Sequence, residues 1–137
     1  MCIRDSSDIL RTAHKARIGR RLIRGVRYEG PWLDIGDPQA YLETNLSVLR
    51  GELKLALDPF ERAVEPPPGV TTEGPVWIGK GAVIEKGAHL CHAIIGANAR
   101  IGAVRVENSV VWDGVELSES IERSVAFERG ILNVEPR

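Results

Sequence analysis

The sequence has few cysteines and no long apolar run. Only Cys2 and Cys91 occur among its 137 residues, which is too few for a disulfide framework, so nothing indicates an oxidising compartment. No segment reaches the roughly 18 consecutive apolar residues that a membrane-spanning helix needs, and the N-terminus lacks the apolar core of a signal peptide. We therefore expect a cytoplasmic protein with no membrane partner.

An excess of charge of one sign is also lacking. Lys and Arg number 18 against 19 Asp and Glu, a formal net charge of −1, and this balance gives no overall attraction to nucleic acid. The charges are not evenly distributed, because one cluster near the N-terminus is basic. It comprises Arg11, Lys15, Arg17, Arg20, Arg21, Arg24 and Arg27. Such a cluster either binds anions or forms a solvated helix face, and the second role is the commoner one. We expect no nucleic-acid partner.

Three elements are expected before residue 55. Residues 8–21 are helix-permissive, with Gly19 weakening the end, and the alternation from Leu22 to Tyr28 is strand-like. Asp37 followed by Pro38 predicts a helix start, because Asp accepts free amide hydrogens and Pro suits the first helical position. This helix is expected to run to about Lys54 with one apolar stripe of Leu42, Leu46, Leu49 and Leu53.

Proline residues mark the expected domain boundary. Pro59 and the run 66–68 cannot continue a helix and favour an extended connector. We assign residues 7–54 to one unit, 55–75 to a linker and 76–137 to a second unit. Residues 1–6 resemble a translated sequencing adaptor, so we expect the natural protein to begin upstream of this chain.

The strongest pattern is a six-residue repeat over residues 76–134. Aliphatic residues recur at this spacing, and two positions before each stands a small or branched residue. Residues two apart on a strand face the same side, so each unit directs one small and one larger side chain inward. The larger set is Ile78, Ile84, Leu90, Ile95, Ile101, Val111 and Leu117, and the smaller set is Val76, Ala82, Ala88, Ala93, Ala99, Ser109 and Val115.

Corner residues support the same reading. Gly81, Gly87, Asn98 and Gly114 follow the aliphatic positions and tolerate a left-handed backbone. Segment 106–110 echoes segment 121–125, as expected for coils that bury their apolar faces by stacking on neighbours. An antiparallel β domain would not keep the inward pair in step over so many units. The pattern resembles the hexapeptide-repeat left-handed parallel β-helix, with roughly three and a half coils.

Histidines are the first candidate functional groups, because many hexapeptide-repeat proteins are acyltransferases with a histidine general base. His89, Cys91 and His92 also suggest a metal cluster. On a strand, however, His89 and Cys91 share a face while His92 points away, so they do not converge without a further donor. We expect these residues and His14 to occupy corner or surface positions.

A second resemblance lies in residues 32–45. Trp32-Leu33-Asp34-Ile35-Gly36-Asp37-Pro38, followed by Tyr41 and Asn45, is similar to the W-x-D-I-G-T-P…Y…N segment of sugar-nucleotide pyrophosphorylases such as mannose-1-phosphate guanylyltransferases. Here Asp37 replaces the usual Thr. The family also has this motif, a linker and hexapeptide repeats in the same order. The resemblance implies the end of a Rossmann-like α/β nucleotidyltransferase domain followed by a left-handed β-helix.

The resemblance also implies a chemistry. The family joins a nucleoside triphosphate and a sugar 1-phosphate with Mg²⁺, and Asp34 matches its second metal carboxylate; the alternative is that Asp34 only hydrogen-bonds the Gly36 turn. The family's G-x-G-x-R-L nucleotide loop is missing, because segment 18–22 lacks its first glycine and the preceding strand. No catalytic residue or nucleotide-binding residue is therefore assigned, and the chain itself is expected to be inactive.

Three functions are weighed. The favoured one is the C-terminal part of a nucleotidyltransferase that makes a nucleotide sugar, GDP-mannose being the expected product, and that forms homo-oligomers through the β-helix. The others are a hexapeptide acyltransferase that uses coenzyme A and a non-catalytic assembly or regulatory module. The upstream sequence distinguishes them, since a G-x-G-x-R-L loop supports only the first. The base and the sugar depend on residues outside this chain.

Overall fold

The computed structural model describes residues 14–20, 22–55 and 63–135, and it divides the chain into one compact unit ending at Pro31 and a second beginning at Trp32. In the first unit, α1 (Lys15–Ile18) is a four-residue helix. Half of the helix predicted over residues 8–21, like the adaptor-like residues 1–6, lies outside the described residues. The strand predicted from Leu22 to Tyr28 is wrong, because this exposed segment has no neighbouring strand to complete its hydrogen bonds.

Helix α2 (Pro38–Leu49) begins where the sequence predicts. The Asp37 carboxylate accepts a hydrogen bond of 2.7 Å from the backbone N–H of Ala40, and Pro38 takes the first helical position. The helix ends earlier than Lys54, because Gly51 adopts a φ of 73° and turns the chain out of the helical path. Leu42 and Leu46 are buried, as predicted.

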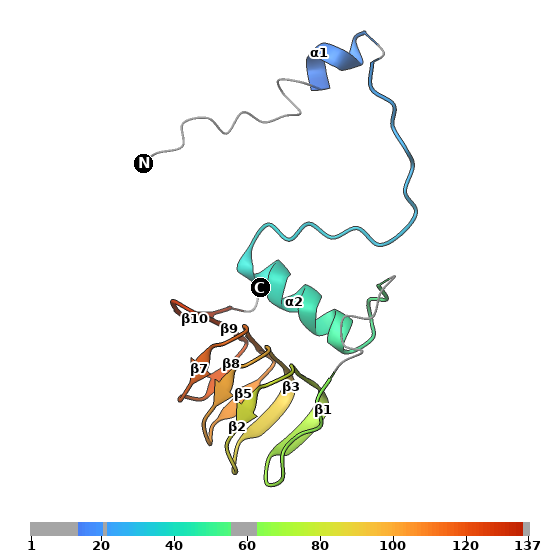
Figure 1. Ribbon diagram of the computed structural model, residues 1–137. Helices are drawn as coiled ribbons and strands as arrows, with labels where there is room; N and C mark the ends of the chain where they lie inside the picture. Colours follow the sequence, from blue (N-terminus) through green and yellow to red (C-terminus); the bar gives the residue numbers. More distant parts are fainter. Residues whose placement is uncertain (1–13, 21, 56–62, 136–137) are drawn as a thin grey trace. The chain divides into compact units, whose positions relative to one another are not determined.

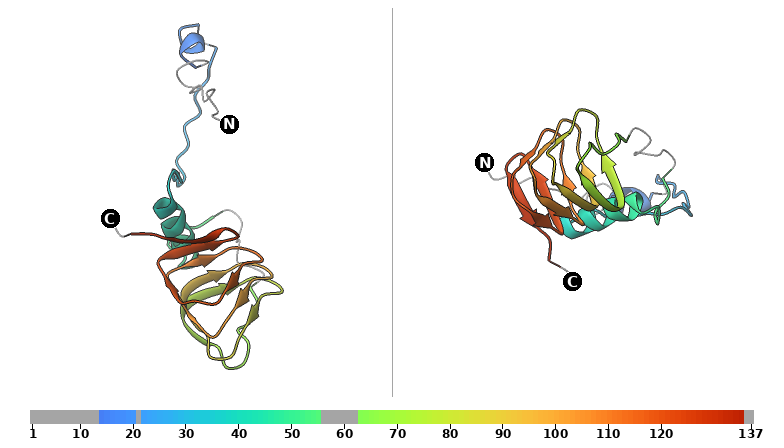
Figure 2. Two further views of the ribbon diagram at one scale, coloured as in Figure 1. Left: turned by 90° about the vertical axis from the view of Figure 1, so that its left-hand side faces the viewer. Right: turned by 90° about the horizontal axis from the view of Figure 1, so that it is seen from below.

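A parallel β-solenoid of about four turns follows (Figures 1 and 2). It begins at Thr71, before the predicted boundary at residue 76, because the first strand extends the ladder along the longer β3. Its strands are β1 (Thr71–Ile78), β2 (Val83–Ile84), β3 (His89–Ile95), β4 (Arg100–Ile101), β5 (Arg105–Glu107), β6 (Val110–Val111), β7 (Glu116–Leu117), β8 (Ile121–Glu122), β9 (Ser124–Phe127) and β10 (Gly130–Asn133).

Each coil has three sides, which stack into three faces. The first face contains residues 71–73, 89–91, 105–107 and 121–122; the second contains 76–78, 93–95, 110–111 and 124–127. The third face is the sheet β2-β4-β7. All of these pairings are parallel, whereas β10 turns back antiparallel to β9. No described segment before residue 71 forms a strand, so the α/β part of the expectation is not seen in the described chain.

The interior confirms the predicted inward positions. All seven larger residues of the repeat are buried, and Ala88, Ala93, Ala99, Ser109 and Val115 are buried between them. The pattern missed Val106, Ile121 and Ala126, which also enter this core. These three residues do not follow the six-residue spacing, because each of the later coils contains fewer residues than three complete six-residue repeats.

The predicted corners are confirmed, and one further column of corners was not predicted. Gly81, Gly87, Asn98 and Gly114 all have positive φ. Between the first and second faces, His92, Asn108 and Arg123 also take φ values of 44–48°. They align with Gly74 of the first coil, where an added Cβ would lie 2.4 Å from the His92 ring. His92 and Arg123 therefore adopt a backbone conformation that is uncommon for residues other than glycine and asparagine.

Two buried serines stabilise this corner. Ser109 directly follows Asn108; its hydroxyl donates to the carbonyl of Glu107 at 2.6 Å and accepts from the backbone N–H of Ser124 at 3.0 Å. Ser124 repeats the arrangement one coil later, with its hydroxyl 2.7 Å from the carbonyl of Glu122. The hydroxyls thus pair backbone groups that the tight turn removes from the strand ladder.

Removing one hydroxyl should therefore destabilise the solenoid. We expect Ser109→Ala to lower the free energy of unfolding by about 1–3 kcal/mol, because the buried N–H of Ser124 loses its acceptor. Urea unfolding followed by circular dichroism measures this change. Ser118→Ala, at an exposed position, is the control and should stay within about 0.5 kcal/mol of the parent; equal effects of the two substitutions would refute the role of the buried hydroxyl.

Helix α2 covers the second face (Figure 2). Leu42 and Leu46 pack against Ile94, Val110 and Val125, and these outward-facing residues complete a second apolar cluster with Val134. The helix and the solenoid are therefore one folded unit. No helix in the described part of the chain is long and apolar enough to cross a membrane.

Candidate functional site

Asp34 lies in the extended segment just before α2. Its carboxylate is exposed and borders a shallow hollow of about 370 Å³. The walls are Leu33, Ala40, Glu43, Thr44, Ser47, Glu52 and Leu53. This segment ends at Asp37, the N-cap of α2.

The described residues around Asp34 do not by themselves form a metal site. Glu43 and Glu52 line the same hollow, but no three His, Cys, Asp or Glu side chains in the described ranges converge to hold an ion. Mg²⁺ uses one or two carboxylates together with substrate phosphates. Asp34 therefore fits as one ligand of a site whose remaining ligands the described chain does not provide.

The alternative role of Asp34 is to accept a hydrogen bond from the turn at Gly36, and the structure contains no such bond among the described residues. The Oδ1 atom of Asp34 lies 3.7 Å from the point where a Cβ of Gly36 would stand, and no hydrogen bond of this carboxylate occurs within residues 22–55 or 63–135. The carboxylate is thus open to solvent. An open position is what a ligand-binding group requires, whereas a turn residue is normally bonded to its own backbone.

Tyr41 and Asn45, the last two motif residues, line a different hollow together with residues of the solenoid. The amide of Asn45 donates to the carbonyl of Tyr41 at 2.8 Å. The Tyr41 ring meets Trp112 edge-on with centroids 6.3 Å apart, and Trp112 lies 5.8 Å from Phe127. Tyr41 therefore joins α2 to the solenoid. The sequence did not predict this aromatic contact, because Trp112 and Phe127 are distant in sequence and outside the repeat positions.

Many apolar side chains in residues 22–35 are exposed. Leu22, Ile23, Val26, Tyr28, Trp32, Leu33 and Ile35 are exposed. Large apolar side chains exposed at such a density along the chain are typical of a segment that contacts another folded element.

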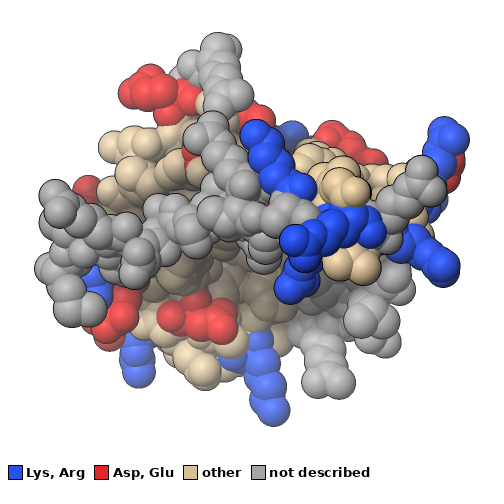
Figure 3. All heavy atoms as spheres, turned by 90° about the horizontal axis from the view of Figure 1, so that it is seen from above, with Lys and Arg blue, Asp and Glu red and all other residues tan. Residues whose placement is uncertain are grey.

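The basic cluster shows no anion site in its described part. Lys15, Arg17, Arg20, Arg24 and Arg27 are all exposed, and Arg27 pairs with Glu29 at 2.6 Å. Both basic and acidic side chains are visible in the view of Figure 3. The exposure of these basic side chains agrees with the expected solvated role. Only Lys15 and Arg17 belong to α1, so the described part of the cluster is not a single helix face.

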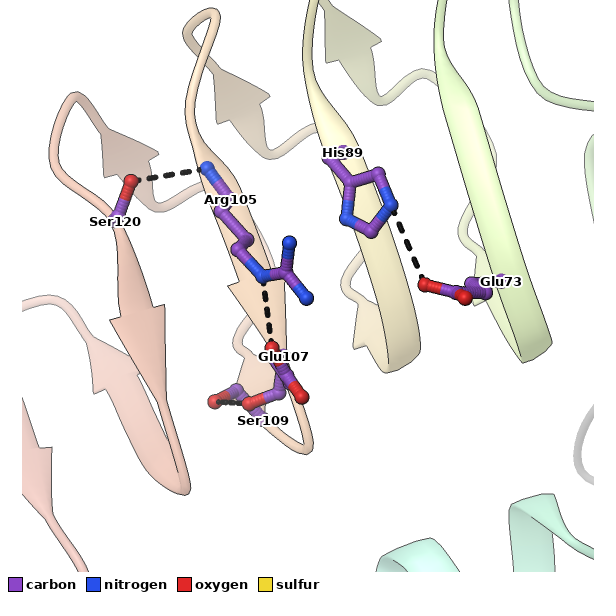
Figure 4. A network of polar contacts seen from close by, with 6 residues as sticks. All are labelled: Glu73, His89, Arg105, Glu107, Ser109 and Ser120. Carbon is purple, nitrogen blue, oxygen red and sulfur yellow. Dashed lines mark hydrogen bonds and ion pairs between the residues drawn. The ribbon is translucent and has the colours of Figure 1, made fainter.

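The predicted corner or surface position is correct for His92, which lies at a corner, but wrong for Cys91, which is buried. His92 is a corner residue, while His89 and Cys91 point outward on the first face. His14 is half-buried at the start of α1 and makes no capping hydrogen bond. Neighbouring strands bring Glu73, Arg105 and Glu107 beside His89 and Cys91 (Figure 4); this grouping could not be predicted without the register.

Comparison with known proteins adds no family assignment. No protein-family model matches the chain, and no curated protein sequence is significantly similar to it.

Proposed function

We propose that this chain is the C-terminal part of a nucleotidyltransferase that makes a nucleotide sugar, with GDP-mannose as the favoured product. The observation that carries the proposal is the order of its elements. The segment Trp32–Pro38 leads directly into a capped helix, which packs on a β-solenoid. We further propose that the solenoid has the left-handed winding of hexapeptide-repeat proteins and mediates self-association of the complete enzyme.

The exposed apolar residues support this proposal. Segment 22–35 is rich in apolar residues but has no strand partner in the described chain. A strand of this composition is stable only when it joins a sheet. A preceding α/β domain would provide that sheet and would bury Trp32, Leu33 and Ile35.

Asp34 has a defined role in the proposed enzyme. Mg²⁺, when bound, would neutralise charge on the reacting phosphates. Asp34 would contribute one carboxylate from the end of the extended segment, and the start of α2 at Asp37 would keep that carboxylate in place. The remaining ligands and the groups that hold the nucleotide would come from the preceding domain.

An activity assay with two proteins tests the proposal. We expect the 137-residue chain to form no nucleotide sugar from any triphosphate and sugar 1-phosphate, because it lacks the nucleotide loop. A longer protein with the upstream domain should form the product with Mg²⁺ and lose most of its activity on Asp34→Ala. Glu52→Ala, which removes a carboxylate from the same hollow, should leave that activity nearly unchanged.

Three results would contradict parts of this proposal. Product formation by the 137-residue chain would show that the site lies elsewhere. Full activity of the longer Asp34→Ala protein would remove Asp34 from the metal site. An upstream sequence without a G-x-G-x-R-L loop, together with no turnover, would overturn the assignment to this enzyme class.

A further inference from the structure

The first face of the solenoid carries a row of metal-binding residue types. Glu73, Cys91 and Glu107 are in register on the adjacent strands β1, β3 and β5. His89 lies two residues before Cys91 on the same face, because Leu90 between them points into the core. Adjacent strands are about 4.8 Å apart. Four side chains of three ligand types are therefore concentrated on one small area.

Cys91 lies at the centre of this area. The residue is only 8% exposed, and its sulfur makes no hydrogen bond with any described residue. On one side, His89 Nε2 lies 3.5 Å from Glu73 Oε2, while the buried Nδ1 of His89 has no partner among the described residues. On the other side, Arg105 Nε donates to Glu107 Oε2 at 2.8 Å (Figure 4).

The carboxylates act on the thiol electrostatically. Burial raises the pKa of Cys91, and the negative charges of Glu107 and Glu73 raise it further, while Arg105 acts in the opposite direction. Glu73 and Glu107 flank Cys91 on the two neighbouring strands, one on each side. A divalent cation at this point would be attracted by both of them and would favour the thiolate.

We propose that Cys91, His89, Glu73 and Glu107 form a binding site for a borderline-soft divalent cation of the Zn²⁺ type. Zn²⁺ is usually four-coordinate in proteins, and its ligands are thiolate, imidazole and carboxylate groups. The sequence alone offered His89 and Cys91 without a further donor, and the register of the strands provides two donors. This inference is independent of the proposed nucleotidyltransferase function, since it concerns another face of the molecule.

Binding requires several of these side chains to rotate. No three of these groups yet converge within the described chain, so Glu73 must turn from its contact with His89, and Glu107 must leave Arg105. The thiol proton is released to solvent as the sulfur–metal bond forms, so one proton leaves for each ion bound through Cys91. Arg105 competes with the ion for Glu107 and sets the affinity.

Co²⁺ titration of the complete chain tests the site, because thiolate ligation produces a charge-transfer absorption band. The Cys2→Ser protein is the reference, since Cys2 is the other cysteine of the sequence. We expect the band to appear, to disappear when Zn²⁺ is added and to be absent in Cys2→Ser/Cys91→Ser. His89→Gln should weaken binding at least about tenfold, the loss typical of removing even a supporting partner of a metal ligand.

Two further variants keep the test informative if a ligand substitution disturbs folding. Arg105→Gln should strengthen Co²⁺ binding, because it frees Glu107 and removes a positive charge. His92→Asn should bind like the reference, because Asn98 and Asn108 already occupy this backbone conformation. Absence of the band in the reference protein, its survival without Cys91, or weaker binding in Arg105→Gln would overturn the proposal.

Discussion

Ile95→Asp is expected to abolish the folded solenoid. Ile95 is 0% exposed and lies in β3, between β1 and β6. An aspartate there would place an unpaired carboxylate in an apolar interior, a cost of about 4 kcal/mol or more, which is a large part of the stability of a small domain. Thermal unfolding followed by circular dichroism should show no cooperative transition.

Val83→Asp is the matched control for Ile95→Asp. Val83 belongs to the same solenoid but points outward from the third face and is 52% exposed. The same change of charge and shape there should cost less than about 1 kcal/mol. A cooperative transition of Ile95→Asp near the parental temperature would refute the assignment of residue 95 to the interior.

Gly96→Ala should have the second largest effect. A Cβ on Gly96 would lie 2.4 Å from the backbone nitrogen of Asp113 and 2.5 Å from the carbonyl carbon of Trp112. Both atoms belong to the backbone of the next coil, so the clash is relieved only if two coils separate. We expect a loss of about 3 kcal/mol or more in the free energy of unfolding, as for severe overpacking.

Gly102→Ala provides the control for Gly96→Ala. Its added Cβ would meet the carbonyl oxygen of Leu117 at 3.5 Å, which is an ordinary contact. This substitution should change stability by less than about 1 kcal/mol, as alanine also restricts the unfolded chain. Urea unfolding of both variants measures the difference, and similar losses would show that close stacking at Gly96 does not limit stability.

The repeat could be predicted because each inward residue obeys a local rule. Ile78, Ile84 and Leu90 follow a strict spacing of six, and glycine or asparagine marks the corners beside them. The column containing His92 and Arg123 was not predicted, because the six-residue pattern marks no corner there and arginine does not favour a positive φ on its own. Stacking on neighbouring coils imposes that conformation, and stacking is not visible in one coil's sequence.

Less of the candidate site could be predicted. The helix start at Asp37 follows from local chemistry and was correct, and Asp34 remains a prediction resting on resemblance. The segment around Leu22 has the composition of a strand, yet strand formation depends on a partner strand that composition does not guarantee. The grouping of Glu73 with Cys91 likewise depends on a register between residues 18 positions apart.

The reversal of β10 has a consequence for fibre formation. A parallel stack exposes unpaired backbone groups at its last coil, and such an edge is a template on which another chain can add strands without limit. On the second face, β10 already occupies that edge of β9, and the side chain of Asn133 lies 2.9 Å from the Ser124 hydroxyl. Elongation along this face therefore requires β10 to detach first, so the turn at Gly130 acts as a barrier to polymerisation.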